Sequence, residues 1–100
     1  MSCWEIRIEG IVQGVGFRPH VYQLAQKEGI KGTVSNGVAG VCIEFAASPE
    51  KAQFFYQKIL DERPRISKVT HHQIQPISPK FFDEFQIIES ESSHIKRIPF

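Results

Sequence analysis

The order of strand-like and helix-like patterns along these 100 residues leaves few folds open to the chain. Residues 4–11 alternate apolar with polar side chains, which predicts a strand with one buried face. A helix is expected to open at Pro19, because proline suits the first helical turn, and to stop at Gly29. One mostly apolar face of this helix is formed by Val21, Leu24, Ala25 and Glu28.

A β-hairpin is predicted next. Residues 32–38 and 40–46 are rich in β-forming side chains, and a short turn near Asn36-Gly37 separates them. Asn-Gly is a strong signal for such a turn, so turn formation is one interpretation of Asn36.

A second helix follows the hairpin. Ser48 supplies its N-cap and Pro49 its first helical residue, and Arg63-Pro64 stops it. Its buried stripe at three- and four-residue spacing is predicted to be Ala52, Phe55, Tyr56 and Ile59.

Two further strands complete the pattern, at residues 66–77 and 84–89. The alternation in the first of them is imperfect, because Val69 shares a face with His71 and Gln73. Either that face is partly exposed to water or a β-bulge resets the register.

The resulting order, β-α-β-β-α-β plus a short final strand, predicts an α+β fold of the ferredoxin-like type. Right-handed crossovers then give one antiparallel sheet with both helices on one face. Residues 1–89 are expected to form one domain, and residues 90–100 a polar tail or linker. The loop after the first strand and the start of the first helix should share one end of the sheet.

Charge and cysteine content restrict the partners and the location of the protein. The formal net charge is +1, which favours neither a nucleic acid nor an acidic partner. Cys3 and Cys42 are isolated and make no CxxC pattern, so no disulfide is expected. No apolar stretch is long enough for a membrane span, and the charges within residues 4–12 do not fit a signal peptide. A cytoplasmic location with reduced thiols is expected.

The four histidines do not predict a metal site. His71 and His72 are adjacent, so on a strand they point to opposite faces and cannot share an ion. With His20 and His94 they give no zinc spacing. Neither a metal nor another cofactor is expected.

The segment Gln13–Arg18 has the features of an anion-binding loop, which the fold alone does not predict. Gly14 and Gly16 free the backbone so that consecutive N–H groups can surround an anion, and the following helix start adds partial positive charge. Arg18 adds a planar cation that can contact two phosphoryl oxygens. The alternative is an ordinary turn with a surface arginine. A Walker-type loop is excluded, because no Gly-Lys-Ser/Thr follows.

Two motifs resemble the acylphosphatase family. The first is Gly10-Ile11-Val12-Gln13-Gly14-Val15-Gly16-Phe17-Arg18, and the second is Gly32-Thr33-Val34-Ser35-Asn36 with Gly40 four residues later. The resemblance covers roughly residues 4–89 and agrees with the predicted fold.

A closer resemblance is to the N-terminal domain of the HypF group, carbamoyltransferases of hydrogenase maturation. The run Arg18-Pro19-His20-Val21-Tyr22-Gln23-Leu24-Ala25 and the absence of an aromatic residue at Thr33 favour that group. Cys42 and Ala47 depart from the family pattern and are interpreted as changes in packing or in a turn.

The resemblance implies a metal-independent hydrolysis of acyl phosphates, with carbamoyl phosphate as the substrate in the HypF group. It implies that Arg18 and Asn36 are catalytic, Asn36 by orienting the attacking water. The phosphate-binding residues would be Gln13, Gly14, Val15, Gly16, Phe17 and Arg18. Further domains of a longer maturation protein would then be partners, and the carbamate would lead to the cyanide ligands of a nickel-iron hydrogenase.

Other functions on the same fold remain as alternatives. A stand-alone general acylphosphatase and a non-catalytic or regulatory phosphate-binding domain both fit the motifs. An RNA-recognition domain would need the RNP-type pattern of aromatic residues on its central strands and a basic face. Cys42-Ile43-Glu44-Phe45 does not have that pattern, and the charge is balanced. A metal chaperone would need cysteines in the first loop, and residues 12–18 contain none.

Overall fold

The computed structural model describes residues 2–88, which form two helices and five strands. In chain order these are β1 (Cys3–Ile11), α1 (Phe17–Glu28), β2 (Lys31–Asn36), β3 (Gly40–Ala46), α2 (Pro49–Asp61), β4 (Lys68–Ile77) and β5 (Phe85–Ile88). The predicted ferredoxin-like order is confirmed. Glu89 and the expected tail at 90–100 lie outside the described residues. No helix in the described part is long and apolar enough to cross a membrane.

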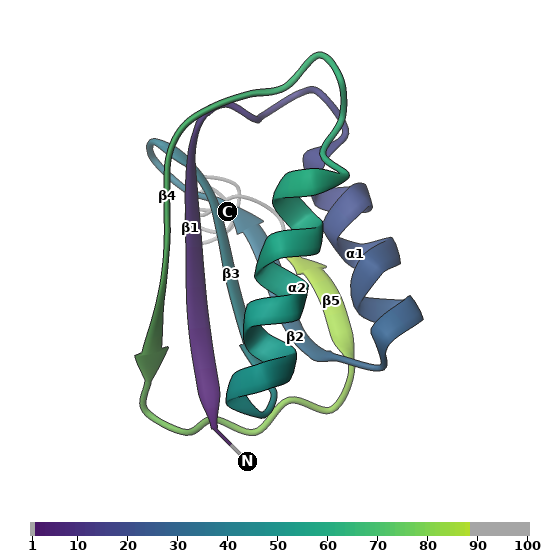
Figure 1. Ribbon diagram of the computed structural model, residues 1–100, viewed down its shortest axis with the longest axis vertical. Coiled ribbons are helices and arrows are strands. Elements are labelled where there is room, and N and C mark those ends of the chain that lie inside the picture. Colours follow the sequence, from purple (N-terminus) through teal and green to yellow (C-terminus); the bar gives the residue numbers. More distant parts are fainter. Residues whose placement is uncertain (1, 89–100) are drawn as a thin grey trace, which may run out of the picture.

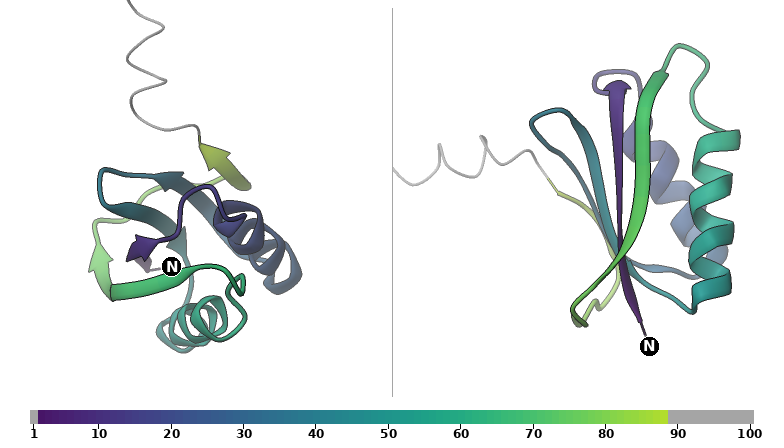
Figure 2. Two further views of the ribbon diagram at one scale, coloured as in Figure 1. Left: turned by 90° about the horizontal axis from the view of Figure 1, so that it is seen from above. Right: turned by 60° about the vertical axis from the view of Figure 1, so that its left-hand side comes forward.

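The strands form one sheet in the order β4-β1-β3-β2-β5, and both helices cover the same face of it (Figures 1 and 2). The expected antiparallel pairing is confirmed for β1 to β4. β5 instead runs parallel to β2, which makes the sheet mixed. The cause is the connection after β4, which crosses from one edge of the sheet to the other before β5 begins (Figure 1).

The core lies between the helices and this face of the sheet. Phe17, Phe45 and Phe55 are almost fully buried there, and the rings of Phe45 and Phe55 meet edge to face at 5.0 Å. The predicted stripe of α2 is confirmed at its three fully buried positions: Ala52, Phe55 and Ile59. Tyr56 is only half-buried, because its hydroxyl bonds to His72 of β4, and Leu60 completes the buried face instead.

A β-bulge explains the imperfect alternation in β4. Glu9 of β1 pairs with His71, while the next residue, Gly10, pairs with Val69, so Thr70 is an extra residue. The bulge turns Val69 toward the helices, where it packs against the core. The strand begins at Lys68 and not at residue 66, because Ser67 first forms a turn with the carbonyl of Pro64.

The sequence predicted the start of α2 correctly but placed the start of α1 two residues too late. α2 begins as expected, with Pro49 first and the Ser48 hydroxyl accepting a bond from the Lys51 N–H at 3.3 Å. α1 begins at Phe17, two residues before Pro19, so Pro19 is its third residue. The earlier start is possible because the first helical residues need no N–H partner, and it is favoured because the Phe17 ring fills the core.

Candidate active site

The loop between β1 and α1 has the backbone that an anion site needs. Gly14 and Gly16 adopt left-handed conformations with φ of 74° and 82°. A Cβ at either position would meet no atom within 4 Å, so backbone conformation and not lack of space is what requires glycine here. Gly16 is also the N-cap of α1 and provides no side-chain cap.

The loop leaves a row of backbone donors unused. Within residues 2–88, the N–H groups of residues 14–18 donate to no protein acceptor. The first helical turn closes only at His20, whose N–H donates to the carbonyl of Gly16 at 3.2 Å. No acidic residue occupies this first turn. The partial positive charge of the helix start therefore remains available to a bound anion.

Arg18 stands in the first turn of α1 and is half-buried. Its Nη1 donates to the backbone carbonyl of Ile88, at the end of β5, with a distance of 3.2 Å. Ile88 pairs in turn with Ser35, the neighbour of Asn36. A guanidinium carries five N–H donors, so this contact orients the group and leaves others for a ligand.

Asn36 is the last residue of β2 and does not form the turn after it. It pairs with Val41 of β3, and neither Asn36 nor Gly37 has the positive φ that an Asn-Gly hairpin turn requires. The turn is closed by the Gly37 N–H, which donates to the Gly40 carbonyl at 2.6 Å. Asn36 shares the helix-facing side of β2 with the buried Val34. Its Oδ1 atom is buried and has no hydrogen-bond partner among the described residues.

Gln13, like Arg18, is a predicted phosphate-binding residue whose side chain already donates to protein carbonyls. Its Nε2 donates to the carbonyl of Gly37 at 2.9 Å and to that of Gly40 at 3.0 Å. These bonds connect the loop to the turn that follows Asn36. The β1–α1 loop, which leads into Arg18, and the end of β2, where Asn36 lies, are therefore at the same end of the sheet, the upper end in Figure 1.

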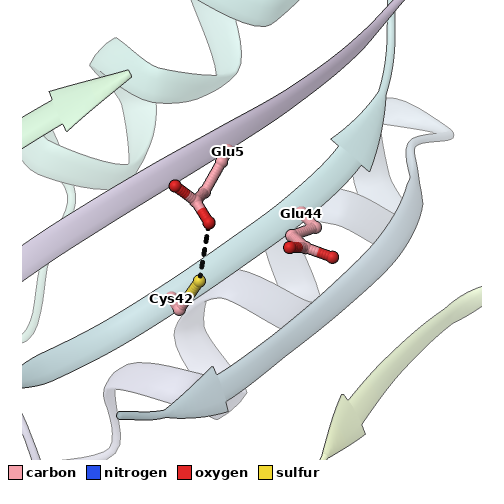
Figure 3. A group of neighbouring side chains, drawn as sticks. All are labelled: Glu5, Cys42 and Glu44. Atoms are coloured by element: carbon pink, nitrogen blue, oxygen red, sulfur yellow. Dashed lines mark hydrogen bonds between the residues drawn. The ribbon is translucent and has the colours of Figure 1, made fainter. Parts of the chain in front are cut away.

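A second polar cluster, which the sequence reasoning missed, lies on the sheet face opposite the helices (Figure 3). Potential ligand atoms of Glu5, Cys42 and Glu44 lie within 4.8 Å of one another. Glu5 and Glu44 face each other in the β1–β3 pairing. Glu5 and Glu44 do fall on polar positions of alternating strands, but β1 and β3 are separated in the chain by α1 and β2, so the sequence alone does not show that the two residues face each other.

Protein groups already neutralise this cluster. Glu5 accepts hydrogen bonds from Arg7 at 3.1 Å and Gln75 at 2.8 Å, and Glu44 pairs with the Lys80 ammonium at 2.6 Å. Burial works against ionisation of Glu5, but the bonds from Arg7 and Gln75 outweigh it and lower its pKa. Burial and then the Glu5 carboxylate raise the pKa of the Cys42 thiol to about 11. A hollow of about 630 Å³ covers this face and reaches Asn36.

The remaining candidate residues are cysteines and histidines. Cys3 and Cys42 are both free thiols. His71 and His72 point to opposite faces of β4: His71 lies 4.0 Å from Glu9 on the open face, and His72 contacts Tyr56 of α2. His20 bonds through Nε2 to the carbonyl of Ile59 at 3.0 Å and so ties α1 to α2.

All seven elements fall almost entirely within the match to a known protein family. Residues 4–87 match the model of the acylphosphatase family. The chain belongs to that family. Among solved structures, the acylphosphatase of Bacillus subtilis is 30% identical, with a TM-score of 0.79, and the match covers 88% of this chain and 99% of that one.

The acylphosphatase relatives include domains of much longer proteins. A probable carbamoyltransferase HypF of Methanocaldococcus jannaschii is 38% identical over 88% of this chain, which spans 12% of that protein. Full-length HypF, solved in a phosphate- and nucleotide-bound form, is 34% identical with a TM-score of 0.83, covering 90% of this chain and 12% of that one. In these relatives the same domain is one part of a multidomain chain.

Proposed function

We propose that this acylphosphatase domain hydrolyses acyl phosphates at the β1–α1 loop. The N–H groups of residues 14–18 and the Arg18 guanidinium hold the phosphoryl group, and Asn36 orients the attacking water. The observation that carries the proposal is the buried, unpartnered Oδ1 of Asn36 at the sheet end where those N–H groups are also unused. This chain belongs to the acylphosphatase family and is similar to proteins named acylphosphatase, which supports a hydrolase activity.

The chemistry requires positioning more than it requires a nucleophilic side chain. The Asn36 amide oxygen accepts a hydrogen bond from water and aligns the water oxygen with phosphorus, but it cannot serve as a base. The water oxygen then forms a bond to phosphorus while the bond from phosphorus to the acyl oxygen breaks. The carboxylate or carbamate departs with the bonding electrons, and the proton of the water passes to a phosphoryl oxygen of the substrate. Arg18 and the loop N–H groups stabilise the charge that the phosphoryl oxygens carry.

The proposal includes independence from metal ions. Five backbone N–H groups and a guanidinium supply the positive charge that a divalent cation supplies in other phosphoryl-transfer sites. Phosphate release should therefore be unchanged after treatment with a chelator.

Carbamoyl phosphate is the proposed substrate, and hydrogenase maturation the proposed setting. The support is the resemblance to HypF proteins, together with Arg18-Pro19 and Thr33 at the two motifs. In that setting the domain would act with further domains of a longer chain, in the cytoplasm. The second candidate is a general acylphosphatase, which the nearly complete coverage of the Bacillus subtilis protein favours.

Phosphate release from carbamoyl phosphate, acetyl phosphate and a phosphate monoester tests this function. The proposal predicts turnover of carbamoyl and acetyl phosphate, with a higher kcat/KM for carbamoyl phosphate, and none of the monoester, whose leaving group is poorer. A preference for acetyl phosphate would favour the general enzyme. Binding of inorganic phosphate without turnover of either acyl phosphate would leave only the non-catalytic alternative.

A further inference from the structure

Gln13 connects the two segments on which the proposed mechanism depends. Its Nε2 spans 24 and 27 residues of sequence to reach the carbonyls of Gly37 and Gly40. Both partners are oxygen acceptors, so only the amide orientation that turns the NH2 group toward the hairpin satisfies both. Its side chain therefore points to the β2–β3 turn and donates both of its protons there.

The turn that Gln13 holds has few other contacts. Its internal bond runs from the Gly37 N–H to the Gly40 carbonyl, so the Gly40 oxygen accepts from both Gly37 and Gln13. Val38 and Ala39, which form the tip, are exposed. Among the described residues, the two bonds from Gln13 are the only side-chain hydrogen bonds to this turn.

Asn36 is the residue directly before this turn. No hydrogen bond among residues 2–88 fixes its buried Oδ1. Its side-chain position therefore depends on the backbone of β2 and on where the turn holds Gly37. A change in the Gln13 contacts would displace the amide that orients the water, while the N–H groups of residues 14–18 would keep their own glycine-dependent geometry.

We propose that Gln13 is a positioning residue that sets Asn36 relative to the phosphate loop, and that it is not itself a phosphate ligand. This rests on the proposed function of the site. Changing Gln13 should therefore affect catalysis without affecting phosphate binding. Phosphate binding depends on the loop and Arg18, whereas the rate of water attack depends also on the bridge from Gln13 to the hairpin.

Gln13→Met is the first test, because methionine has a similar length but no N–H donor and no charge. The matched control is Gln53→Met, at an exposed glutamine of α2. With carbamoyl and acetyl phosphate, kcat of Gln13→Met should fall about tenfold to a hundredfold, as expected for a small misplacement of a reacting group. KM and the inhibition constant of inorganic phosphate should stay within about twofold of the wild type. An increase in both constants with kcat unchanged would show Gln13 to be a direct phosphate ligand and would overturn the proposal.

A double-mutant cycle then tests whether Gln13 acts through Asn36. Adding Gln13→Met to Asn36→Ala should cause little further loss, because the residue that Gln13 positions is already absent. A full additional loss would contradict the proposal.

If the Asn36→Ala background is too slow to measure, NMR tests whether Gln13 positions Asn36. In Gln13→Met the side-chain NH2 signals of Asn36 should shift or broaden, while phosphate still shifts the amide signals of residues 14–18. Unchanged Asn36 signals would overturn the proposal.

The role of Gln13 and the function of the loop can be tested separately. Full activity in an Arg18→Gln variant would refute the proposed function. An inactive Arg18→Gln variant combined with wild-type kinetics in Gln13→Met would refute only the role of Gln13.

Discussion

The Nη1 atom of Arg18 donates to the carbonyl oxygen of Ile88 at 3.2 Å, across 70 residues of sequence. This bond joins the first turn of α1 to the end of β5, which pairs in parallel with the part of β2 that leads to Asn36. The short edge strand β5 therefore does more than extend the sheet. It orients the guanidinium at the same end of the sheet as the free N–H groups of the β1–α1 loop.

The left-handed glycine at the N-cap of α1 should not tolerate a side chain. In Gly16→Ala, a Cβ at φ of 82° is expected to cost about 1–2 kcal/mol or to shift the loop backbone. Chemical denaturation and phosphate release would detect these two outcomes. For the denaturation measurement Gly37→Ala is the matched control, because Gly37 has no positive φ and its nearest new contact would be 3.8 Å away. Equal losses of stability at both positions would argue against a strained loop backbone.

Two adjacent phenylalanines of α2 should differ strongly in their contribution to stability. Phe55 is fully buried against Phe45, whereas Phe54 is 48% exposed. Phe55→Ala should lower the free energy of unfolding by about 3–5 kcal/mol, because it leaves a cavity in the core. Phe54→Ala should cost below about 1 kcal/mol, including its contact with Lys58. Urea denaturation of both variants measures the difference, and similar losses would contradict the packing of α2.

The Glu5 carboxylate should make stability dependent on pH in the acidic range. Its folded pKa is below the ordinary value of 4.5, so the folded state gains stability above that value and loses it as pH falls through the lowered pKa. Glu5→Gln should therefore be less stable than the wild type at pH 7, and the difference should shrink below about pH 4.5. Thermal unfolding between pH 7 and pH 3 tests this, with the exposed Glu50→Gln as a control for the lost charge. A difference that stays constant with pH would show that the cluster stabilises the sheet by packing alone.

Local patterns sufficed to predict most of the fold. Alternation in residues 4–11, the Ser48-Pro49 cap and the stop signals at Gly29 and Arg63-Pro64 predicted the main elements. For the irregularity at Val69 a β-bulge was one of two predicted explanations, and the structure has the bulge. The parallel pairing of β5 was not predictable in this way, because it depends on which sheet edge the preceding connection reaches. The two-residue error at the start of α1 arose because the burial of Phe17 outweighed the preference of proline for the first helical position.

The sequence proposed residues for the candidate site but could not give their contacts. Two motifs carried the resemblance that named Arg18, Asn36 and the glycines, and the same resemblance implied their roles. The sequence placed Gln13 in the phosphate loop but could not show that its side chain contacts the β2–β3 hairpin. Likewise, the proximity of Glu5, Cys42 and Glu44 depends on strand register, which a single chain read in order does not reveal.

Phosphate release from carbamoyl and acetyl phosphate by the Arg18→Gln variant is the decisive test of acyl-phosphate hydrolysis at the β1–α1 loop. Loss of a preorganised donor to the developing charge should raise the barrier by about 2.7–4 kcal/mol, which is about a hundredfold to a thousandfold in kcat. The thermal unfolding midpoint should remain close to that of the wild type, since Arg18 makes one hydrogen bond at the surface. Arg65→Gln, at an exposed arginine, should keep full activity. A folded Arg18→Gln variant with wild-type turnover would contradict the assignment of this loop as the site of acyl-phosphate hydrolysis.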